Sequence, residues 1–222
     1  MLSKVFKNTV TLALILSLNA CANGSLKLDI DNNFPKLVLQ EYFTSPSKTW
    51  GLPPGTAMKD GGLFRKEPTK KTLRSSLWYG HNFKDVDFSS NVSKISGPDD
   101  VEFGIIARYQ NGNFYYLLIK GEGQVAMGKY SESKGWEDKV AWQNSTAIKP
   151  RKNQNRLRIV CNGKNIIGWV NDRKVGEFED SSYTSGQIGV TSARGNGEAV
   201  AVYFDNVLAK EKPKTKTVKE KV

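Results

Sequence analysis

The side chains best suited to chemistry lie around one predicted β-hairpin, whose strands span residues 102–109 and 114–120. Asp100 and Glu102 are two positions apart, so their carboxylates share one face of an extended strand, and this face continues to Arg108. A carboxylate beside a guanidinium can hold neighbouring hydroxyls of a sugar. The alternative interpretation is an acidic cluster at the mouth of a strand.

The register of the predicted hairpin determines which residues would line a groove. With residues 110–113 as a four-residue loop, Tyr109 lies opposite Phe114, and Arg108 and Tyr115 become cross-strand neighbours. We expect their face to line a ligand groove, in which Arg108 donates hydrogen bonds and Tyr115 stacks on a sugar ring.

Catalytic chemistry has little support in the sequence. Glycoside hydrolysis needs two carboxyl groups about 5 to 9.5 Å apart across the substrate, and no motif assigns such a pair. His81 is the only histidine, which excludes a multi-histidine metal site and argues against a Ser–His–Asp triad. We therefore assign no catalytic residue and favour a binding protein over an enzyme.

Aromatic residues are a stronger signal than the carboxylates. Tryptophan and tyrosine offer flat apolar area plus one polar group, which suits the face of a pyranose ring. Trp136 and Trp142 lie in a polar, turn-rich stretch, where we expect exposed rings. Trp78 and His81 are further candidate sugar contacts, at the end of a strand. Core packing is the competing interpretation for these tryptophans.

Short apolar and β-branched runs, separated by turn residues, predict an all-β domain. After the N-terminal region, no long window keeps the 3.6-residue period of a helix. The hairpin is apolar on both faces, so we expect it inside a sandwich of two antiparallel sheets. The other main predicted strands are residues 36–43, 76–80, 83–95, 124–130, 156–161, 164–170, 174–178, 185–192 and 198–208.

The N-terminus has the features of an export signal. A basic segment precedes a short apolar run, residues 10–18, which suits a signal-peptide core but is too short to span a bilayer. Residues 18–21, Leu-Asn-Ala-Cys, resemble the lipobox of bacterial lipoproteins. The resemblance implies cleavage before Cys21 and a lipid on its thiol. Ordinary secretion is the alternative, because alanine flanks the cysteine on each side.

These features divide the chain into four parts. Residues 1–20 are the predicted lipoprotein signal peptide, 21–33 a tether, 34–209 the β-sandwich domain and 210–222 a basic, disordered tail. The tail holds six lysines and two glutamates, so it carries +4 of the net charge of +11. Because these lysines alternate with Pro, Thr, Val and Glu, we interpret the tail as solvated and expect no nucleic-acid partner.

The chain contains two cysteines. Once Cys21 is lipidated, Cys161 has no partner for a disulfide. Cys161 lies in an apolar run, so we expect a buried, inert thiol.

The order and chemistry of the predicted strands resemble a concanavalin A-like jelly roll, in its laminin-G-like branch. The matching segments are residues 41–50, 103–109, 113–116, 155–158, 169–172, 185–189 and 203–207. This branch includes 3-keto-disaccharide hydrolase domains, glycan-binding modules and many proteins of no known activity. The resemblance implies a jelly-roll fold and a structural calcium ligand at Asp205, completed by Asp29 or Asp31. We expect no other cofactor.

We expect a lipid-anchored binding module of the bacterial cell envelope, facing the periplasm or the cell exterior. It would recognise carbohydrate or serve as an envelope adaptor for another protein. The alternatives are a glycan-active hydrolase of the 3-keto-disaccharide group and a structural subunit of an envelope complex. The lack of a carboxylate motif favours binding, and a basic loop, residues 65–74, leaves room for an anionic partner. The predicted ligand-binding residues are Arg108, Tyr115, Glu102, Asp100, Trp78, His81, Trp136 and Trp142.

Overall fold

The computed structural model describes residues 33–45, 47–67, 74–193 and 199–213. The predicted signal peptide, Cys21, Asp29, Asp31 and most of the predicted tail lie outside these residues. In the described part of the chain, no helix has the length and apolarity that crossing a membrane requires.

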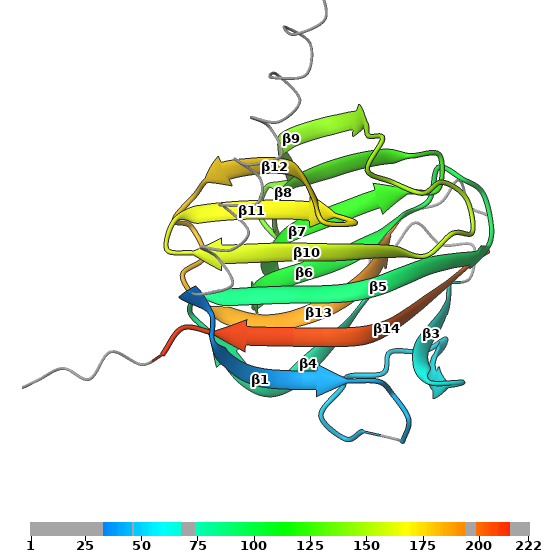
Figure 1. Cartoon of the computed structure of the whole chain (residues 1–222), viewed down its shortest axis with the longest axis horizontal. Helices are drawn as coiled ribbons and strands as arrows, with labels where there is room; N and C mark the ends of the chain where they lie inside the picture. The colour runs from blue at the N-terminus through cyan, green and yellow to red at the C-terminus, as the bar shows by residue number, and fades with distance from the viewer. Residues whose placement is uncertain (1–32, 46, 68–73, 194–198, 214–222) are drawn as a thin grey trace, which may run out of the picture.

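The described residues form two antiparallel sheets packed face to face, which confirms the predicted all-β sandwich (Figure 1). The eight-stranded sheet has the order β12-β11-β10-β5-β14-β3-β2, and β1 also pairs with β14. Its strands are β1 (Lys36–Glu41), β2 (Thr56–Lys59), β3 (Gly62–Glu67), β5 (Val86–Ser96), β10 (Asn155–Asn162), β11 (Asn165–Val170), β12 (Arg173–Glu179) and β14 (Val200–Glu211). The six-stranded sheet has the order β4-β13-β6-β7-β8-β9. Its strands are β4 (Arg74–Phe83), β6 (Glu102–Gln110), β7 (Asn113–Lys120), β8 (Gln124–Ser131), β9 (Gly135–Asn144) and β13 (Gly186–Ala193).

One large apolar core lies between the sheets. Alternate residues of each strand point inward, and fully buried side chains such as Phe88, Leu117 and Ile159 fill the space between the two layers. Cys161 belongs to this core and is a free, buried thiol, as predicted. Burial raises the pKa of its thiol to about 12, which keeps the sulfur protonated and unreactive at neutral pH.

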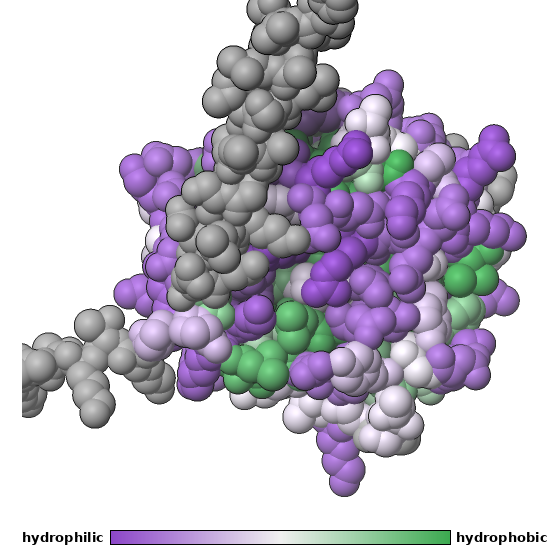
Figure 2. Space-filling model, in the orientation of Figure 1, coloured by the Kyte–Doolittle hydropathy of each residue, from purple (hydrophilic) through white to green (hydrophobic). Residues whose placement is uncertain are grey.

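The outer face of the eight-stranded sheet carries a small apolar cluster of its own. Phe34 packs there against Val160, Ile167 and Trp169. Figure 2 looks onto the side of this sheet and shows a mostly hydrophilic surface, with a small apolar patch near β1 and β14.

Strand β9 is not among the predicted strands, which leave residues 131–142 as a polar excursion. It lies at the edge of its sheet and pairs with β8. Its side chains are exposed or at most half-buried, so its sequence lacks the strong apolar alternation of a half-buried strand. The pairing with β8 places Trp136 and Trp142 on a strand instead of in a loop, although the register shifts next to Trp142.

The β6–β7 hairpin is present, but its predicted register is wrong. The turn has two residues, Asn111 and Gly112, and both have the positive φ that such a turn requires. Arg108 also has positive φ, and a bulge there shifts the pairing so that Tyr115 lies opposite Ala107. Tyr115 therefore lies on the inner face of the sheet, and its two neighbours in β7 face outward.

The last strand continues past the predicted domain boundary at residue 209. Glu211 pairs with Lys36 of β1, and its carboxylate accepts hydrogen bonds from Lys36 Nζ at 2.5 Å and His81 Nε2 at 2.8 Å. Burial raises the pKa of Glu211, but these two partners outweigh that effect and lower it. The contact joins β1, β14 and β4, where the two ends of the domain meet.

Candidate functional site

Two neighbouring surfaces of the six-stranded sheet are candidates for ligand binding, and the β8–β9 hairpin separates them. Lys129 pairs across this hairpin with Glu137, and the next pair is Tyr130 with Trp136. Because consecutive residues of a strand point to opposite faces, the aromatic pair faces outward and the charged pair faces the end of the interior. We call the first region the aromatic surface and the second the end cleft.

The aromatic surface is a cluster of rings on the outer face of the sheet. It consists of Tyr109, Phe114, Tyr116, Tyr130, Trp136 and Trp142, packed with Leu77, Ile106 and Leu118. The rings of Phe114 and Tyr130 stack with centroids 5.2 Å apart, and Trp136 meets Tyr130 edge-on at 5.0 Å. Such ring pairs contribute about 0.5–1.5 kcal/mol beyond their burial. Phe114 is fully buried, whereas Tyr130 and Trp136 are half-buried, so fixed rings reach the surface.

Trp142 extends the aromatic surface along β9. Lys120 Nζ lies 4.5 Å from the centroid of its indole ring, a cation–π contact. Lys120 is the cross-strand partner of Glu102, so this predicted carboxylate lies on the same outer face. The structure thus brings three of the predicted site residues, Glu102, Trp136 and Trp142, to one side of the sheet.

A glycine leaves room beside these rings. A Cβ atom at Gly128 of β8 would collide with the backbone carbonyl oxygen of Glu137 and with the Tyr116 hydroxyl. That hydroxyl hydrogen-bonds to the exposed carboxylate of Asp138 in β9. The pair adds polar groups to a surface that is otherwise aromatic.

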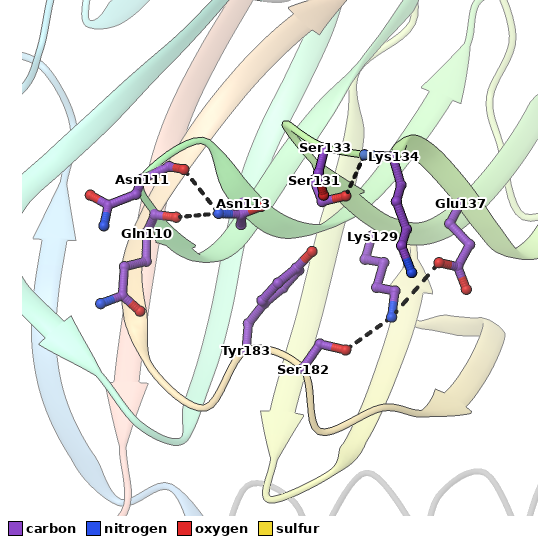
Figure 3. A pocket seen from close by; sticks show the side chains of 10 residues that line it. All are labelled: Gln110, Asn111, Asn113, Lys129, Ser131, Ser133, Lys134, Glu137, Ser182 and Tyr183. Atoms are coloured by element: carbon purple, nitrogen blue, oxygen red, sulfur yellow. Dashed lines mark hydrogen bonds and ion pairs between the residues drawn. The ribbon is translucent and has the colours of Figure 1, made fainter.

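The end cleft is a cavity of about 450 Å³ at one end of the sandwich (Figure 3). It lies between the β6–β7 turn, the β8–β9 turn and the segment that joins β12 to β13. Its lining residues are Gln110, Asn111, Asn113, Lys129, Ser131, Ser133, Lys134, Glu137, Ser182 and Tyr183. The volume falls in the range of about 300–1,000 Å³ that is usual for small-molecule sites. Every lining side chain can hydrogen-bond, which suits a hydroxyl-rich ligand better than an apolar one.

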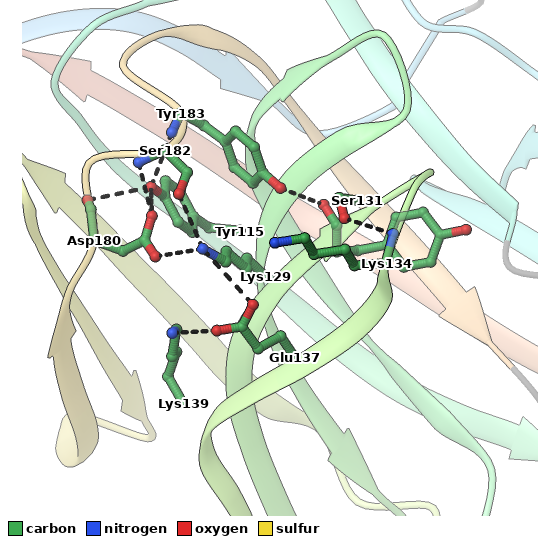
Figure 4. A network of polar contacts seen from close by, with 10 residues as sticks. Tyr115, Lys129, Ser131, Lys134, Glu137, Lys139, Asp180, Ser182 and Tyr183 are labelled. Carbon is green, nitrogen blue, oxygen red and sulfur yellow. Dashed lines mark hydrogen bonds and ion pairs between the residues drawn. The ribbon is translucent and has the colours of Figure 1, made fainter.

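Asp180 is the centre of a polar network behind this cleft (Figure 4). Its carboxylate accepts hydrogen bonds from the Tyr115 hydroxyl at 2.7 Å, from Lys129 Nζ at 2.7 Å and from the Ser182 N–H at 2.8 Å. Burial raises the pKa of Asp180, but the hydrogen bonds outweigh burial and hold the pKa well below its ordinary value. The hydrogen bond to Asp180 also raises the pKa of Lys129, so both groups are charged at neutral pH.

The same network fixes one wall of the cleft. The Tyr183 N–H donates to the Tyr115 hydroxyl at 3.1 Å, and the Tyr183 hydroxyl donates to the backbone carbonyl of Tyr130 at 3.0 Å. Burial raises the pKa of Tyr115, so its hydroxyl stays protonated and continues to donate to Asp180. The segment before β13 is therefore held against β7 and β8 in a defined conformation.

The predicted groove around Arg108 and Tyr115 is not open. Tyr115 is fully buried and Arg108 is 1% exposed. The guanidinium donates to three backbone carbonyls and to Asp85, whose carboxylate oxygen is 3.1 Å from Nη2. The expectation that these residues line a groove is wrong, because the bulge at Arg108 turns both side chains into the domain.

Trp78 and His81 lie on β4, at the opposite edge of the sheet from β9. Trp78 is 8% exposed, belongs to the core and donates its indole N–H to Thr49 Oγ1 at 3.1 Å. The His81 side chain is one-third exposed and contacts Glu211. The structure therefore separates these two predicted sugar contacts from Trp136.

The remaining predicted residues lie apart from both surfaces. Asp100 precedes β6, and its buried Oδ1 has no hydrogen-bond partner among the described residues. Asp205 of β14 accepts hydrogen bonds from Asn206 at 3.0 Å and Gln154 at 3.4 Å. Within the described ranges, no three His, Cys, Asp or Glu side chains gather as metal ligands. Calcium at Asp205 stays a prediction, because the other proposed ligands lie outside these ranges.

The residues of the end cleft carry no common motif in the sequence. Lys129 and Asp180 are 51 positions apart, and no local pattern joins them. One signal is present in the segment 180–185, a run of turn-forming residues that includes Tyr183 and lies between two predicted strands. Such a run is typical of an ordered surface loop, which often carries function.

Comparisons with known proteins agree with this architecture. Residues 40–210 match the family model of the 3-keto-alpha-glucoside-1,2-lyase-like domain. The structure is similar to carbohydrate-binding module CBM66 from Bacillus subtilis, with a TM-score of 0.61 and 18% identity, covering 73% of this chain and 96% of that chain. It is also similar to a β-1,3-1,4-glucanase (lichenase) derived from a mouse hindgut metagenome, with a TM-score of 0.60, 11% identity and coverage of 79% and 99%. No curated protein matches the chain in sequence. The structural likeness shows the fold, and it confirms the predicted jelly roll.

Proposed function

Because the chain belongs to the 3-keto-alpha-glucoside-1,2-lyase-like domain family, we propose that it is a carbohydrate-binding module that holds glycans on its aromatic surface. The observation that carries this proposal is the set of half-buried rings, Tyr130, Trp136 and Trp142, on one face of the six-stranded sheet. A pyranose ring packs its C–H groups on such a surface. The packed rings lose little further freedom on binding, which favours affinity.

Polar groups around the rings would orient the sugar. Asp138 and Lys120 lie beside Trp136 and Trp142 on the same face, and Glu102 lies opposite Lys120. A carboxylate accepts hydrogen bonds from sugar hydroxyls and an ammonium group donates them. An apolar platform with a few such groups is the general form of a small-molecule site.

The proposed location is the bacterial cell envelope. The segment 18–21 resembles a lipobox, and a lipid on Cys21 would tether the domain to a membrane while it faces the periplasm or the exterior. Two or more acyl chains give stable anchoring, whereas one chain alone is marginal. An anchored module of this kind would hold a glycan, or a glycan-bearing envelope protein, close to the membrane.

A glycan array tests the proposed binding. The full chain, purified in detergent, is applied to the array together with the variants Trp142→Ala and Tyr42→Ala. Tyr42 is 46% exposed and follows β1 in the other sheet, so its variant is a matched control. We expect the wild-type chain and Tyr42→Ala to bind the same glycans, and Trp142→Ala to lose most of the signal. A wild-type chain that retains no glycan would contradict the proposal.

The family match supports a second function, the cleavage of a glycan. Incubation of the full chain with a 3-keto-alpha-glucoside, followed by chromatography of the released sugar, tests this function. Release at a rate proportional to protein concentration would support an enzyme, and release equal to that of a heat-denatured control would exclude this activity.

A further inference from the structure

The lining of the end cleft contains two lysines, Lys129 and Lys134, and one carboxylate, Glu137. Lys129 Nζ lies 2.7 Å from Asp180 and 3.7 Å from Glu137, and Lys139 forms an ion pair with Glu137. This ion pair lowers the pKa of Glu137, so the carboxylate is ionised at neutral pH.

Lys134 is the cation left over. It lies in the β8–β9 turn, and no ion pair joins its Nζ to another of the described residues. Its backbone N–H donates to Ser131 Oγ at 3.1 Å, which fixes the base of the side chain. Figure 3 shows the side chain reaching toward Lys129 and Glu137 across the cleft. An anionic group in the cleft would give Lys134 a partner.

The rest of the lining favours hydroxyl groups. Asn113 Nδ2 donates to the backbone carbonyls of Gln110 and Asn111 at 3.2 and 2.9 Å, which holds the amide in place. Ser133 and Ser182 add hydroxyls that both donate and accept. Tyr183 supplies an aromatic ring. Its position is fixed because both the backbone N–H and the hydroxyl of this residue donate hydrogen bonds. A fixed ring beside amides and hydroxyls is suited to a sugar.

We propose that the end cleft binds a sugar that carries a carboxylate, such as a hexuronate. The carboxylate pairs with Lys134, and the sugar hydroxyls bond to the amide and serine side chains. The carboxylate of the ligand supplies the partner that Lys134 lacks among the described residues, and the cavity of about 450 Å³ is of the size used for small ligands. The inference rests on the proposed glycan-binding function, although it uses a surface separate from the aromatic one.

Amide chemical shifts of the full chain, isotope-labelled and held in detergent, test this site. The chain is titrated separately with glucuronate, glucose and acetate. We expect glucuronate to shift the amides of residues 110–113, 131–134 and 182–183 with saturation, and the other two probes to do so much more weakly. Lys134→Gln is expected to weaken glucuronate binding about tenfold, equivalent to about 1.4 kcal/mol. Lys152→Gln, at an exposed site in another loop, is the control and is expected to have no effect.

The outcomes separate this inference from the proposed function. Acetate shifts as large as those of glucuronate would reduce the cleft to a simple anion site and overturn the inference. The inference would be overturned if Lys134→Gln bound glucuronate with unchanged affinity. It would also be overturned if no amide of the cleft shifted while array glycans still bound the aromatic surface. Either result would leave the proposed function standing. Saturable glucuronate shifts in the cleft, with no glycan bound by the aromatic surface, would support the inference and contradict the proposed function.

Discussion

The substitution Asp180→Asn tests whether the network behind the end cleft stabilises the domain. The asparagine keeps the shape of the side chain and one carbonyl oxygen. It loses the negative charge that pairs with Lys129 at 2.7 Å. The Asp180 side chain is 9% exposed, so solvent replaces little of this interaction. A hydrogen bond between charged groups at such a site contributes about 1.5–3 kcal/mol, and we expect the free energy of unfolding to fall by that amount at pH 7.

The loss of unfolding free energy in Asp180→Asn is expected to depend on pH in a defined direction. The pKa of Asp180 is depressed in the folded state, so its stabilisation is present above the ordinary value of about 3.9 and is lost as the pH falls below it. The difference in unfolding free energy between wild type and Asp180→Asn is therefore constant from pH 5 to 7 and shrinks below pH 4.

Urea denaturation followed by tryptophan fluorescence measures both effects. Glu179→Gln is the matched control, because the Lys164–Glu179 pair is 2.8 Å long but 63% and 62% exposed. An exposed pair of this kind contributes about 0–1 kcal/mol. A double-mutant cycle with Lys129→Gln isolates the coupling between Lys129 and Asp180. Equal losses in Asp180→Asn and Glu179→Gln, or a loss that does not change with pH, would refute the reasoning.

Three further predictions concern residues elsewhere. Arg108→Gln leaves the Asp85 carboxylate without its buried partner and is expected to lower the free energy of unfolding by about 3–5 kcal/mol; a loss below about 1 kcal/mol in urea denaturation would contradict the structural role. Cys161, whose pKa is raised to about 12, is expected to react with a thiol reagent only after unfolding, so rapid labelling of the folded protein would be contrary evidence. Cys21→Ser is expected to abolish labelling with palmitate and to move the protein out of the membrane fraction. Unchanged labelling and sedimentation would refute the lipid anchor.

The fold was predictable because it follows from local patterns. Alternating apolar residues and turn formers mark most of the strands, and the Asn171–Asp172 turn has the positive φ angles of a tight hairpin. The buried state of Cys161 follows from the apolar run around it. What failed is the register between β6 and β7, since the bulge at Arg108 puts Tyr115, and not Phe114, on the core face that β7 shares with β6.

The candidate site was less predictable, because it depends on long-range pairing. Trp136 and Trp142 stand out by type, but their common surface exists only because β9 pairs with β8 at the edge of the sheet. The end cleft depends on contacts between segments that are far apart in sequence, such as Lys129 with Asp180. No short-range sequence pattern predicts that a lysine in a strand will contact an aspartate in a distant loop.

Calorimetric titration of the full chain with the glycan it binds best on the array tests the central claim most directly. The claim is that the rings of the aromatic surface supply the binding energy. We predict that Trp142→Ala weakens binding by about 1–3 kcal/mol, the scale of a lost stacking contact, while the variant stays folded at the temperature of the titration, and that Tyr42→Ala binds like wild type. Equal affinity in wild type and Trp142→Ala would contradict the claim.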